Sequence, residues 1–446
     1  MLLEFENIAK IKQATIELTD LTVITGVNNS GKGTVSKILY ALLTGINLYQ
    51  GNYLFALKYT VIMEELENLE RWVEKDTFPS VNALRREVQT VLYQVEHNQH
   101  GVDHKEIFAE DTKLTEQITD LLSNIQRKMS TKVRWPNRQQ IAAIIKTIFQ
   151  QQNRDYLDEK TVAALFDRLL RQEFSNYIIS DSSLNKSALL SLQEEDDHLI
   201  LPYKSNRLDN FQCQFQLTHT YKEAICLDDP DLLDNLALAT DEQFFGKAPS
   251  EKLQQANEAS HRKRLIKQIM QRQPKENYLR DKKIIAIFSE VLNGQLVRKR
   301  DGYYFFQKNS LKGVPFNSLS SGTKIFALLQ LIVLNGIAAD SSCLIFVEPE
   351  THLHPQWQVK LAELLVRITT VYSVKVLITS RSPYIIEALD IFSTQESIGT
   401  KFYNTSPDKR DANASLIVDT TDNLEAIYDE MYQPLIYLEQ LRAKLN

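Results

Sequence analysis

The chain has 446 residues and a formal net charge of −6, so it is long enough for two or three domains and is not a globally basic protein that coats nucleic acid. Its three cysteines lack metal-ligand spacing, which favours a reduced, cytoplasmic setting without a metal site. The N-terminus has no basic n-region, and the longest apolar run, residues 325–339, is too short and too polar for a bilayer. We therefore expect neither a signal peptide nor a membrane partner.

Residues 1–50 alternate between short strands and a loop bounded by glycines. The pattern predicts strands around Leu2–Glu6 and Ala14–Leu18, a strand over Leu21–Thr25, and a helix that ends near Asn47. A strand, a glycine-bounded loop and a helix start, in that order, are what a phosphate-binding loop requires. The alternative is a chance glycine turn between a strand and a helix.

The loop holds most of the candidate nucleotide-binding residues, which are Gly26, Asn28, Asn29, Ser30, Gly31, Lys32, Gly33 and Thr34. Its glycines let backbone N–H groups surround a polyphosphate at the positive end of the following helix. Lys32 can then reach the outer phosphates as a point charge. The residue after this lysine is usually Ser or Thr, whose hydroxyl binds Mg²⁺, and here it is Gly33. The loop therefore indicates nucleotide binding more strongly than ordinary metal-assisted hydrolysis.

The middle of the chain interrupts this pattern. Residues 51–196 carry apolar residues at helical spacing but only about two heptads, so we predict a compact helical insertion and no long coiled-coil arm. Residues 197–276 combine two strands, near His198–Leu201 and Phe211–Leu217, with a basic helical stretch over Arg262–Lys275. This stretch, like the basic residues around Trp135, either contacts nucleic-acid phosphates or only keeps a helix face solvated.

Residues 277–446 return to an α/β pattern that would complete the sheet begun by residues 1–50. The predicted elements are a strand pair of Leu296–Val297 with Gly302–Phe306, a helix over Lys324–Leu334, a strand over Leu344–Val347, a helix over Gln356–Thr369, a strand over Val374–Ile378, a helix over Tyr384–Leu389, and a closing amphipathic helix with Leu424, Ile427, Met431, Leu435, Leu438 and Leu441 on one face.

Three sets of polar residues stand at the ends of these elements. Ser320, Ser321 and Gly322 open a helix, where a free N-terminus and a hydroxyl suit an anion, although the same residues also make an ordinary N-cap. Glu348 and Arg381 each follow a predicted strand. Because parallel strands end at one edge of a sheet, these positions belong beside the phosphate-binding loop.

Together these motifs resemble ABC-class ATPases, and within them the ATPases of bacterial antiphage and overcoming-lysogenization-defect systems. The Septu-type ATPase subunit is the closest family that we can name. The resemblance covers roughly residues 1–50 and 277–446. It implies an α/β ABC-type ATPase head, a P-loop NTPase, with a large and mostly helical insertion. It also implies ATP as the ligand and two copies that sandwich it, each loop facing Ser320–Gly322 of the other.

The resemblance also assigns roles to single residues. Glu348 falls on the general base that orients the attacking water. Val347 falls on the acid that should support Mg²⁺, and moving the register by one residue would put Pro349 at the base instead. Arg381 stands where the family has a histidine that contacts the γ-phosphate. Gly33, Val347 and Arg381 thus each remove a catalytic group, so we expect weakly held Mg²⁺ and slow or absent hydrolysis.

The function that the resemblance implies is a regulatory, nucleotide-sensing scaffold of an antiphage defence complex. Such a scaffold would form a head-to-head dimer or a higher oligomer and control a separately encoded HNH-type nuclease. An active DNA-repair or DNA-loading ATPase is the alternative, with nucleic acid as a partner. A transporter motor is disfavoured because the insertion is far larger than such motors carry.

Overall fold

The computed structural model describes residues 1–50, 53–97, 104–131, 137–152, 159–179, 187–214, 222–234, 260–279, 281–299, 302–408 and 410–444. The chain divides into two compact units. Unit 1 comprises Met1–Gly45, Phe166–Asp241 and Ala259–Asn446, and unit 2 comprises Ile46–Leu165 and Glu242–Glu258.

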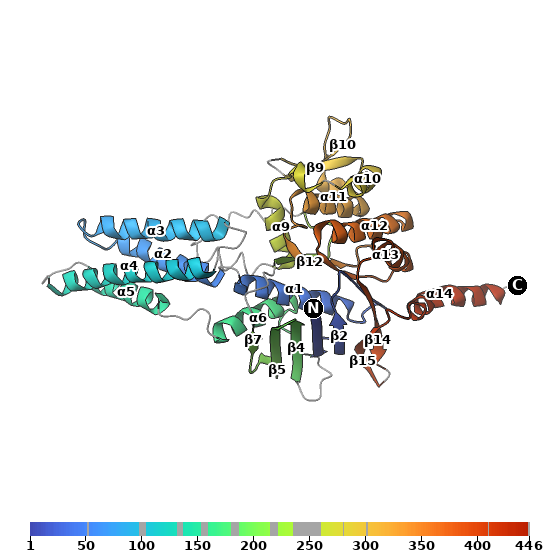
Figure 1. Cartoon of the computed structure of the whole chain (residues 1–446), viewed down its shortest axis with the longest axis horizontal. Coiled ribbons are helices and arrows are strands. Elements are labelled where there is room, and N and C mark those ends of the chain that lie inside the picture. Colours follow the sequence, from blue (N-terminus) through green and yellow to red (C-terminus); the bar gives the residue numbers. More distant parts are fainter. Residues whose placement is uncertain are drawn as a thin grey trace. The chain divides into compact units, whose positions relative to one another are not determined.

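Unit 1 is built on one mixed sheet (Figure 1). Its strands are β1 (Leu2–Ile8), β2 (Ile11–Glu17), β3 (Leu21–Gly26), β4 (Ser187–Glu194), β5 (Asp197–Lys204), β6 (Arg207–Leu208), β7 (Gln212–Gln214), β8 (Glu223–Leu227), β12 (Ser341–Val347), β13 (Lys375–Thr379), β14 (Thr400–Asp408) and β15 (Asp411–Asp419). The described strands lie in the order β6-β5-β4-β1-β2-β15-β14-β3-β13-β12-β8, with β7 beside β5.

The strands from β14 to β8 in this order are all parallel. Every residue of β3 is buried, as are most residues of β12 and β13, which is the pattern of parallel strands covered by helices. The helices within unit 1 are α9 (His261–Gln271), α10 (Lys282–Val291), α11 (Ser321–Leu334), α12 (Pro355–Tyr372), α13 (Pro383–Glu396) and α14 (Glu425–Ala443), with short 3₁₀ turns at Glu276–Tyr278 and Phe316–Ser318. Two of the boundaries between the units fall inside helices. One lies in α1 (Lys32–Gln50), after Gly45, and the other lies in α6 (Glu159–Glu173), between Leu165 and Phe166.

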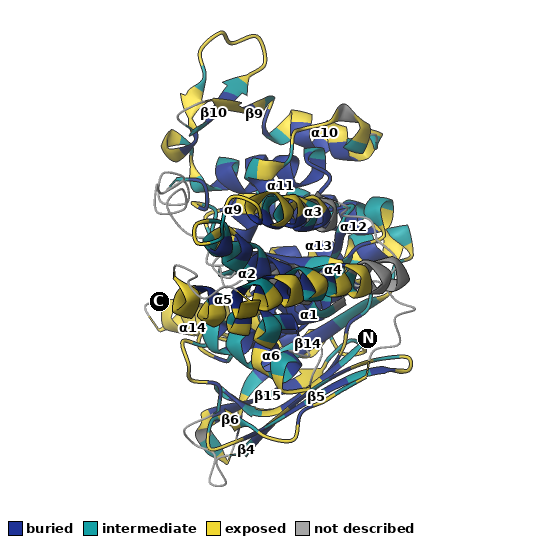
Figure 2. Cartoon of the chain, turned by 90° about the vertical axis from the view of Figure 1, so that its left-hand side faces the viewer, coloured by how far each residue is buried: buried dark blue, intermediate teal, exposed yellow. Residues whose placement is uncertain are grey.

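The predicted α/β class, with both ends of the chain in one sheet, is confirmed by the pairing of β3 with β13. The predicted hairpin is confirmed as well, since β9 (Gly294–Lys299) and β10 (Gly302–Gln307) pair antiparallel, followed by β11 (Val314–Pro315). Most of the apolar run at 325–339 belongs to the buried helix α11, which ends at Leu334 (Figure 2). Gly336, two residues later, has a positive φ of 69°.

The sequence pattern missed β14 and β15. Their residues mix Asn, Thr, Ser, Pro and Asp with apolar side chains, so they show neither a clean alternation nor an apolar run. Both strands nevertheless belong to the centre of the sheet, where β14 pairs with β3. Tertiary pairing with a buried neighbour thus overrides a weak local preference.

Unit 2 is helical in its described part. Its helices are α2 (Tyr53–Glu70), α3 (Phe78–His97), α4 (His104–Thr131) and α5 (Arg138–Gln152). They bury one separate apolar cluster, to which α2 contributes Ile62, Leu66 and Leu69 and α5 contributes Ile141, Ile145 and Ile148. The spacing of three and four residues is that of one helix face, as the sequence predicts.

An imidazole joins three elements of unit 1. His261, at the start of α9, places Nδ1 2.9 Å from Glu173 Oε2 at the end of α6 and Nε2 3.0 Å from Asp228 Oδ2 just after β8. Burial disfavours a charged imidazole, but the hydrogen bonds to both carboxylates outweigh it and raise the pKa of His261 to about 9. Burial likewise opposes ionisation of Asp228, yet its bonds to His261 and Arg262 lower its pKa to about 2. His261 and Asp228 are therefore both charged at neutral pH.

The His261 cluster predicts how stability depends on pH. Because its folded-state pKa exceeds the ordinary value of 6.5, the stabilisation is complete below about pH 6.5 and is lost as the pH rises through about 9. We expect the melting midpoint of the wild type to fall between about pH 7 and about pH 10. This fall should exceed that of His261→Gln over the same range by roughly 2 °C or more. Circular dichroism melts measure this, with His198→Gln as the control, and parallel curves for wild type and His261→Gln would contradict the assignment.

Candidate nucleotide-binding site

The loop between β3 and α1 turns through three residues with positive φ, which are Gly26 at 134°, Asn29 at 59° and Gly31 at 98°. Residues with side chains rarely adopt such angles, and glycine does so freely. Space is also short, since a Cβ on Gly26 would lie 2.1 Å from Thr405 Oγ1 and one on Gly31 would lie 2.4 Å from Ile11 Cδ1. Both motif glycines are therefore required by the backbone and by their neighbours.

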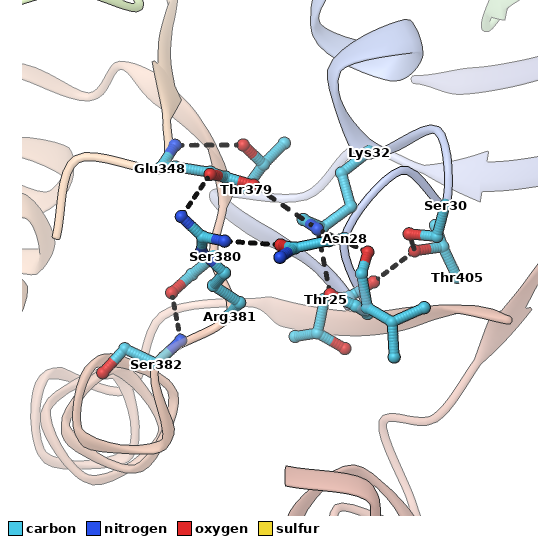
Figure 3. Close-up of polar contacts among 12 residues, drawn as sticks. Thr25, Asn28, Ser30, Lys32, Glu348, Thr379, Ser380, Arg381, Ser382 and Thr405 are labelled. Carbon is cyan, nitrogen blue, oxygen red and sulfur yellow. Dashed lines mark hydrogen bonds and ion pairs between the residues drawn. The ribbon is translucent and has the colours of Figure 1, made fainter. Parts of the chain in front are cut away.

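Lys32 is the first residue of α1, and its side chain is only 4% exposed. Its Nζ donates to the carbonyl oxygens of Gly26 and Val27, each at 2.9 Å, and lies 3.4 Å from Glu348 Oε1 (Figure 3). The cation thus sits at the positive end of a helix, inside a loop whose backbone folds around it. This is the arrangement that binds a polyphosphate.

The neighbouring strand β14 braces the loop. Ser30 Oγ lies 2.5 Å from Thr405 Oγ1, which in turn donates to the carbonyl oxygen of Thr25 at 2.7 Å. Ser30 and Thr405 are both buried. Sequence reasoning missed Thr405 because no local motif marks β14, and only the parallel pairing of β14 with β3 places the hydroxyl there.

Glu348 and Arg381 meet the loop at the carboxyl ends of β12 and β13. Glu348 Oε2 lies 3.4 Å from Arg381 Nη2, and Arg381 Nη1 donates to Asn28 Oδ1 (Figure 3). With the contact from Lys32, the carboxylate of Glu348 stands between two cations. The structure therefore brings together Asn28, Lys32, Glu348 and Arg381 from three neighbouring strand ends.

Glu350 is a further residue of this site that sequence reasoning did not single out. It is 6% exposed, and its Oε1 accepts hydrogen bonds from Ser380 Oγ and from the Arg381 backbone N–H, both at 2.8 Å. Burial raises the pKa of Glu350. The contact ties the turn after β12 to the turn that carries Arg381. The only feature of the sequence that could have pointed to Glu350 is its place as the second acid of the Glu348-Pro349-Glu350 run.

The donors suit a polyphosphate better than Mg²⁺. A Cβ on Gly33 would meet no atom within 4 Å, so that position is open, but it offers no hydroxyl. Thr34 is buried beside it, and its backbone N–H donates to the carbonyl oxygen of Gly31 at 2.9 Å. Val347 ends β12 with an apolar side chain, and the described residues hold no group of three or more His, Cys, Asp or Glu side chains that could bind a metal. A hard cation prefers several oxygen ligands, but Glu348 is already paired with two cations, and Glu350 is buried with its Oε1 bound to Ser380 and to the Arg381 backbone.

Ser320–Gly322 form the start of α11. Ser320 is exposed, and its Oγ accepts from the Thr323 backbone N–H at 3.3 Å as an N-cap. Ser321 is half-buried, while a Cβ on Gly322 would lie 3.1 Å from Leu353 and 3.3 Å from Trp357. The hydrogen bonds described for Ser320 stay within this helix start, so they do not join it to the loop at Gly26–Thr34 in the same chain.

A chain of hydrogen bonds nevertheless leads from the Arg381 turn toward α11. Ser382 N–H donates to Ser380 Oγ at 3.1 Å, and Ser382 Oγ donates to Gln358 Oε1 at 2.5 Å. Gln358 Nε2 then donates to the carbonyl oxygen of Leu353 at 2.9 Å. Because Leu353 touches Gly322, a shift of the Arg381 turn has a packed route to the start of α11.

The predicted basic stretch is largely neutralised within the chain. Arg262 pairs with Asp228 and Asp229, Arg264 pairs with Glu223, and Arg272 pairs with Asp340. Of the basic residues around Trp135, Lys128 and Arg138 are described, in α4 and α5, while Lys132 and Arg134 lie outside the described residues. No helix in the described part of the chain has the length and hydropathy to cross a membrane.

Comparison with known proteins adds the family. A family model described as the AAA ATPase domain matches residues 2–386. Structural comparison aligns the chain with the SMC head domain from Thermotoga maritima, at 10% identity over 94% of this chain and 97% of that chain with a TM-score of 0.38. It also aligns with the SmcHead bound to the C-winged helix domain of ScpA, at 11% identity over 95% and 98% with a TM-score of 0.40. A third is the Smc head domain with an extended coiled coil bound to the C-terminal domain of ScpA from Pyrococcus furiosus, at 12% identity over 99% and 98% with a TM-score of 0.37.

These identities and TM-scores are too low to carry any property over to this chain. No curated protein matches the sequence.

The loop geometry predicts opposite outcomes for two glycines. Gly26→Ala forces a Cβ to within 2.3 Å of the Thr405 backbone oxygen, so we expect it to lower the free energy of unfolding by about 2 kcal/mol or more. Gly33→Ala meets open space inside a helix, where Ala is favoured over Gly by up to about 1 kcal/mol. Urea unfolding compares the two variants, and equal stabilities would refute this account of the loop.

Proposed function

Because the chain belongs to the AAA ATPase domain family, we propose that it binds ATP at Gly26–Thr34 and hydrolyses it slowly or not at all. The observation that carries this proposal is the buried Lys32 at the start of α1, held inside a loop with three positive-φ residues. In the nucleotide complex, the loop amides and Lys32 bind the phosphates, and Lys32 exchanges its contacts to the Gly26 and Val27 carbonyls for phosphate oxygens.

Arg381 adds a second cation to the proposed phosphate site. Its guanidinium is held between Asn28 and Glu348, close to Lys32. A guanidinium carries a permanent charge and can bind two phosphate oxygens at once, so it favours binding. It cannot switch between donor and acceptor as a neutral histidine can. We therefore assign Arg381 to nucleotide recognition and to the stability of the bound state.

Slow hydrolysis follows from the groups around Glu348. Glu348 is the residue placed to orient a water, but both of its oxygens face cations. Gly33 and Val347 supply no ligand for Mg²⁺, the ion that normally neutralises the developing charge in phosphoryl transfer. Each missing group removes several kcal/mol of transition-state stabilisation. The nucleotide-bound state is then long-lived, which suits a sensor better than a motor.

The wider role that we propose is a regulatory subunit of an antiphage defence complex, in which two copies enclose ATP and control a separately encoded HNH-type nuclease. Its support is the resemblance of the motifs at Gly26–Thr34, Ser320–Gly322, Glu348 and Arg381 to the antiphage ATPases, and the exposure of Ser320, which can meet the nucleotide of a second copy. The hydrogen-bonded route from Arg381 to Leu353 would couple the nucleotide to this contact. Sequencing the neighbouring genes tests the proposed partner. We expect a gene for an HNH-type nuclease next to the gene for this chain.

An active ATPase that works on DNA remains the second candidate. The observation in its favour is the segment between β10 and β11, where Lys308 and Lys312 are exposed and can contact phosphates. Turnover that DNA stimulates severalfold would favour this candidate, and Lys308→Glu with Lys312→Glu should then remove the stimulation.

Nucleotide titration and turnover assays test the central proposal. We expect ATP binding in the wild type and a loss of roughly 100-fold or more in Lys32→Ala, equivalent to about 3 kcal/mol. Lys10→Ala, on the surface between β1 and β2, is the matched control and should bind normally. No measurable ATP affinity in the wild type would overturn the proposal.

The same assays test the missing metal ligands. Gly33→Ser together with Val347→Asp restores a hydroxyl and a carboxylate, so we expect Mg²⁺-dependent turnover to rise about tenfold or more over the wild type. Adding Glu348→Gln to this variant should abolish the gain, because the general base is then lost. Brisk turnover by the wild-type chain would contradict the slow-hydrolysis part, even with ATP binding confirmed.

A further inference from the structure

The two halves of α14 have different surroundings. Leu424, Tyr428 and Met431 pack against the main apolar cluster of unit 1, and Ile427 is fully within it. From Tyr432 to Lys444, by contrast, every residue is exposed (Figure 2). The predicted helix forms, but its apolar face is covered only in the first half, whereas Leu435, Leu438 and Leu441 are exposed.

The exposed half of α14 is rich in large apolar side chains. These are Tyr432 at 41% exposure, Leu435 at 56%, Ile436 at 43%, Tyr437 at 61%, Leu438 at 57% and Leu441 at 38%. They do not form one stripe, because at about 100° per residue they lie on several sides of the helix. A helix that is apolar on several sides is normally buried, and a contiguous apolar patch of a few hundred Å² marks an interaction site.

The exposed half of α14 is also short for a helix that has no surface to pack on. Isolated helices shorter than about 12–15 residues are marginal in water, since most helical stability comes from tertiary packing. Beyond Met431, no described residue outside α14 packs on the apolar side chains of this segment closely enough to cover them. Its first half is held by packing and by Asn404, whose Nδ2 donates to Glu430 Oε2 at 2.8 Å. The exposed half is thus presented from a fixed base but lacks a surface to pack on.

We propose that the segment Tyr432–Lys444 packs antiparallel against the same segment of a second copy of this chain. The charges along α14 are self-complementary in this orientation. Its first half carries Glu425, Asp429 and Glu430, and its last turns carry Arg442 and Lys444, with Glu439 one turn before them. An antiparallel pair centred near Ile436 sets Asp429 and Glu430 beside the partner's Arg442 and the partner's Lys444, whereas a parallel pair would align like charges.

This contact has two-fold symmetry, so one self-complementary surface closes the dimer without leaving a free copy of it. It uses no residue of the loop Gly26–Thr34, of Ser320–Gly322, or of the Arg381 turn. The α14 pair is therefore independent of nucleotide and separate from the ATP-dependent contact proposed above. A chain with both contacts can form assemblies larger than a dimer.

The test is the mass of the full-length protein without nucleotide, measured by light scattering after size-exclusion chromatography and by sedimentation equilibrium. We expect a dimer at micromolar concentration, and Leu435→Glu with Leu438→Glu should weaken the self-association at least tenfold. Ile391→Glu is the matched control, because Ile391 is exposed to 47% on another helix and should leave the dimer intact. Thermal melts of both variants should match the wild type, since all these side chains are exposed.

Charge reversal tests the orientation. Lys444→Glu should weaken the dimer severalfold, and adding Asp429→Lys should restore it, because the pair is then reversed rather than removed. A cysteine at Ile436 should cross-link two copies under mild oxidation, whereas one at Asp429 should not. A monomeric wild type, a dimer insensitive to Leu435→Glu with Leu438→Glu, or a failure of the charge rescue would each overturn the proposal.

Discussion

The close packing of Gly26 against Thr405 is the constraint on which the nucleotide site depends. It exists because β3 and β14 run parallel in register, with Thr405 beside Gly26, and because no side chain fits between them. The same contact lets Thr405 hold Ser30 and Thr25, so the loop is fixed from the strand side while α1 fixes it from the other. A phosphate-binding loop in this chain is thus a property of the whole sheet and not of nine consecutive residues alone.

Electrostatics then decides what the loop can do. Two cations, Lys32 and Arg381, converge on the carboxylate of Glu348, which both of them contact. The balance favours a bound anion and disfavours a bound Mg²⁺, because the positions of Gly33 and Val347 offer no oxygen. This balance is the physical basis of the proposal that the chain holds ATP for a long time and has a regulatory role.

Buried polar groups also join elements that are distant in sequence. Glu350 links the turns after β12 and β13, and His261 links α6, β8 and α9 through two carboxylates. Burial raises the pKa of Glu350, whereas for His261 burial lowers the pKa and the two carboxylates outweigh it and raise the pKa to about 9. At the opposite extreme, the end of α14 leaves a run of large apolar side chains in water.

The sequence alone determined the features that rest on local order: the strand, glycine loop and helix around Lys32, the α/β class, a helical insertion after this helix, and the residue types at Gly33, Val347, Glu348 and Arg381. The predicted extent of the insertion, residues 51–196, was wrong, because β4 (Ser187–Glu194) pairs with β1 in the main sheet. These depend on spacing within a few residues, which a pattern records directly. Only the tertiary structure decided that Thr405 braces the loop, that Glu350 holds Arg381, that acids within the chain neutralise Arg262 and Arg264, and that the face of α14 is buried only as far as Met431. Those contacts join segments up to several hundred residues apart, and their energies come from burial and charge that arise only once the sheet has assembled.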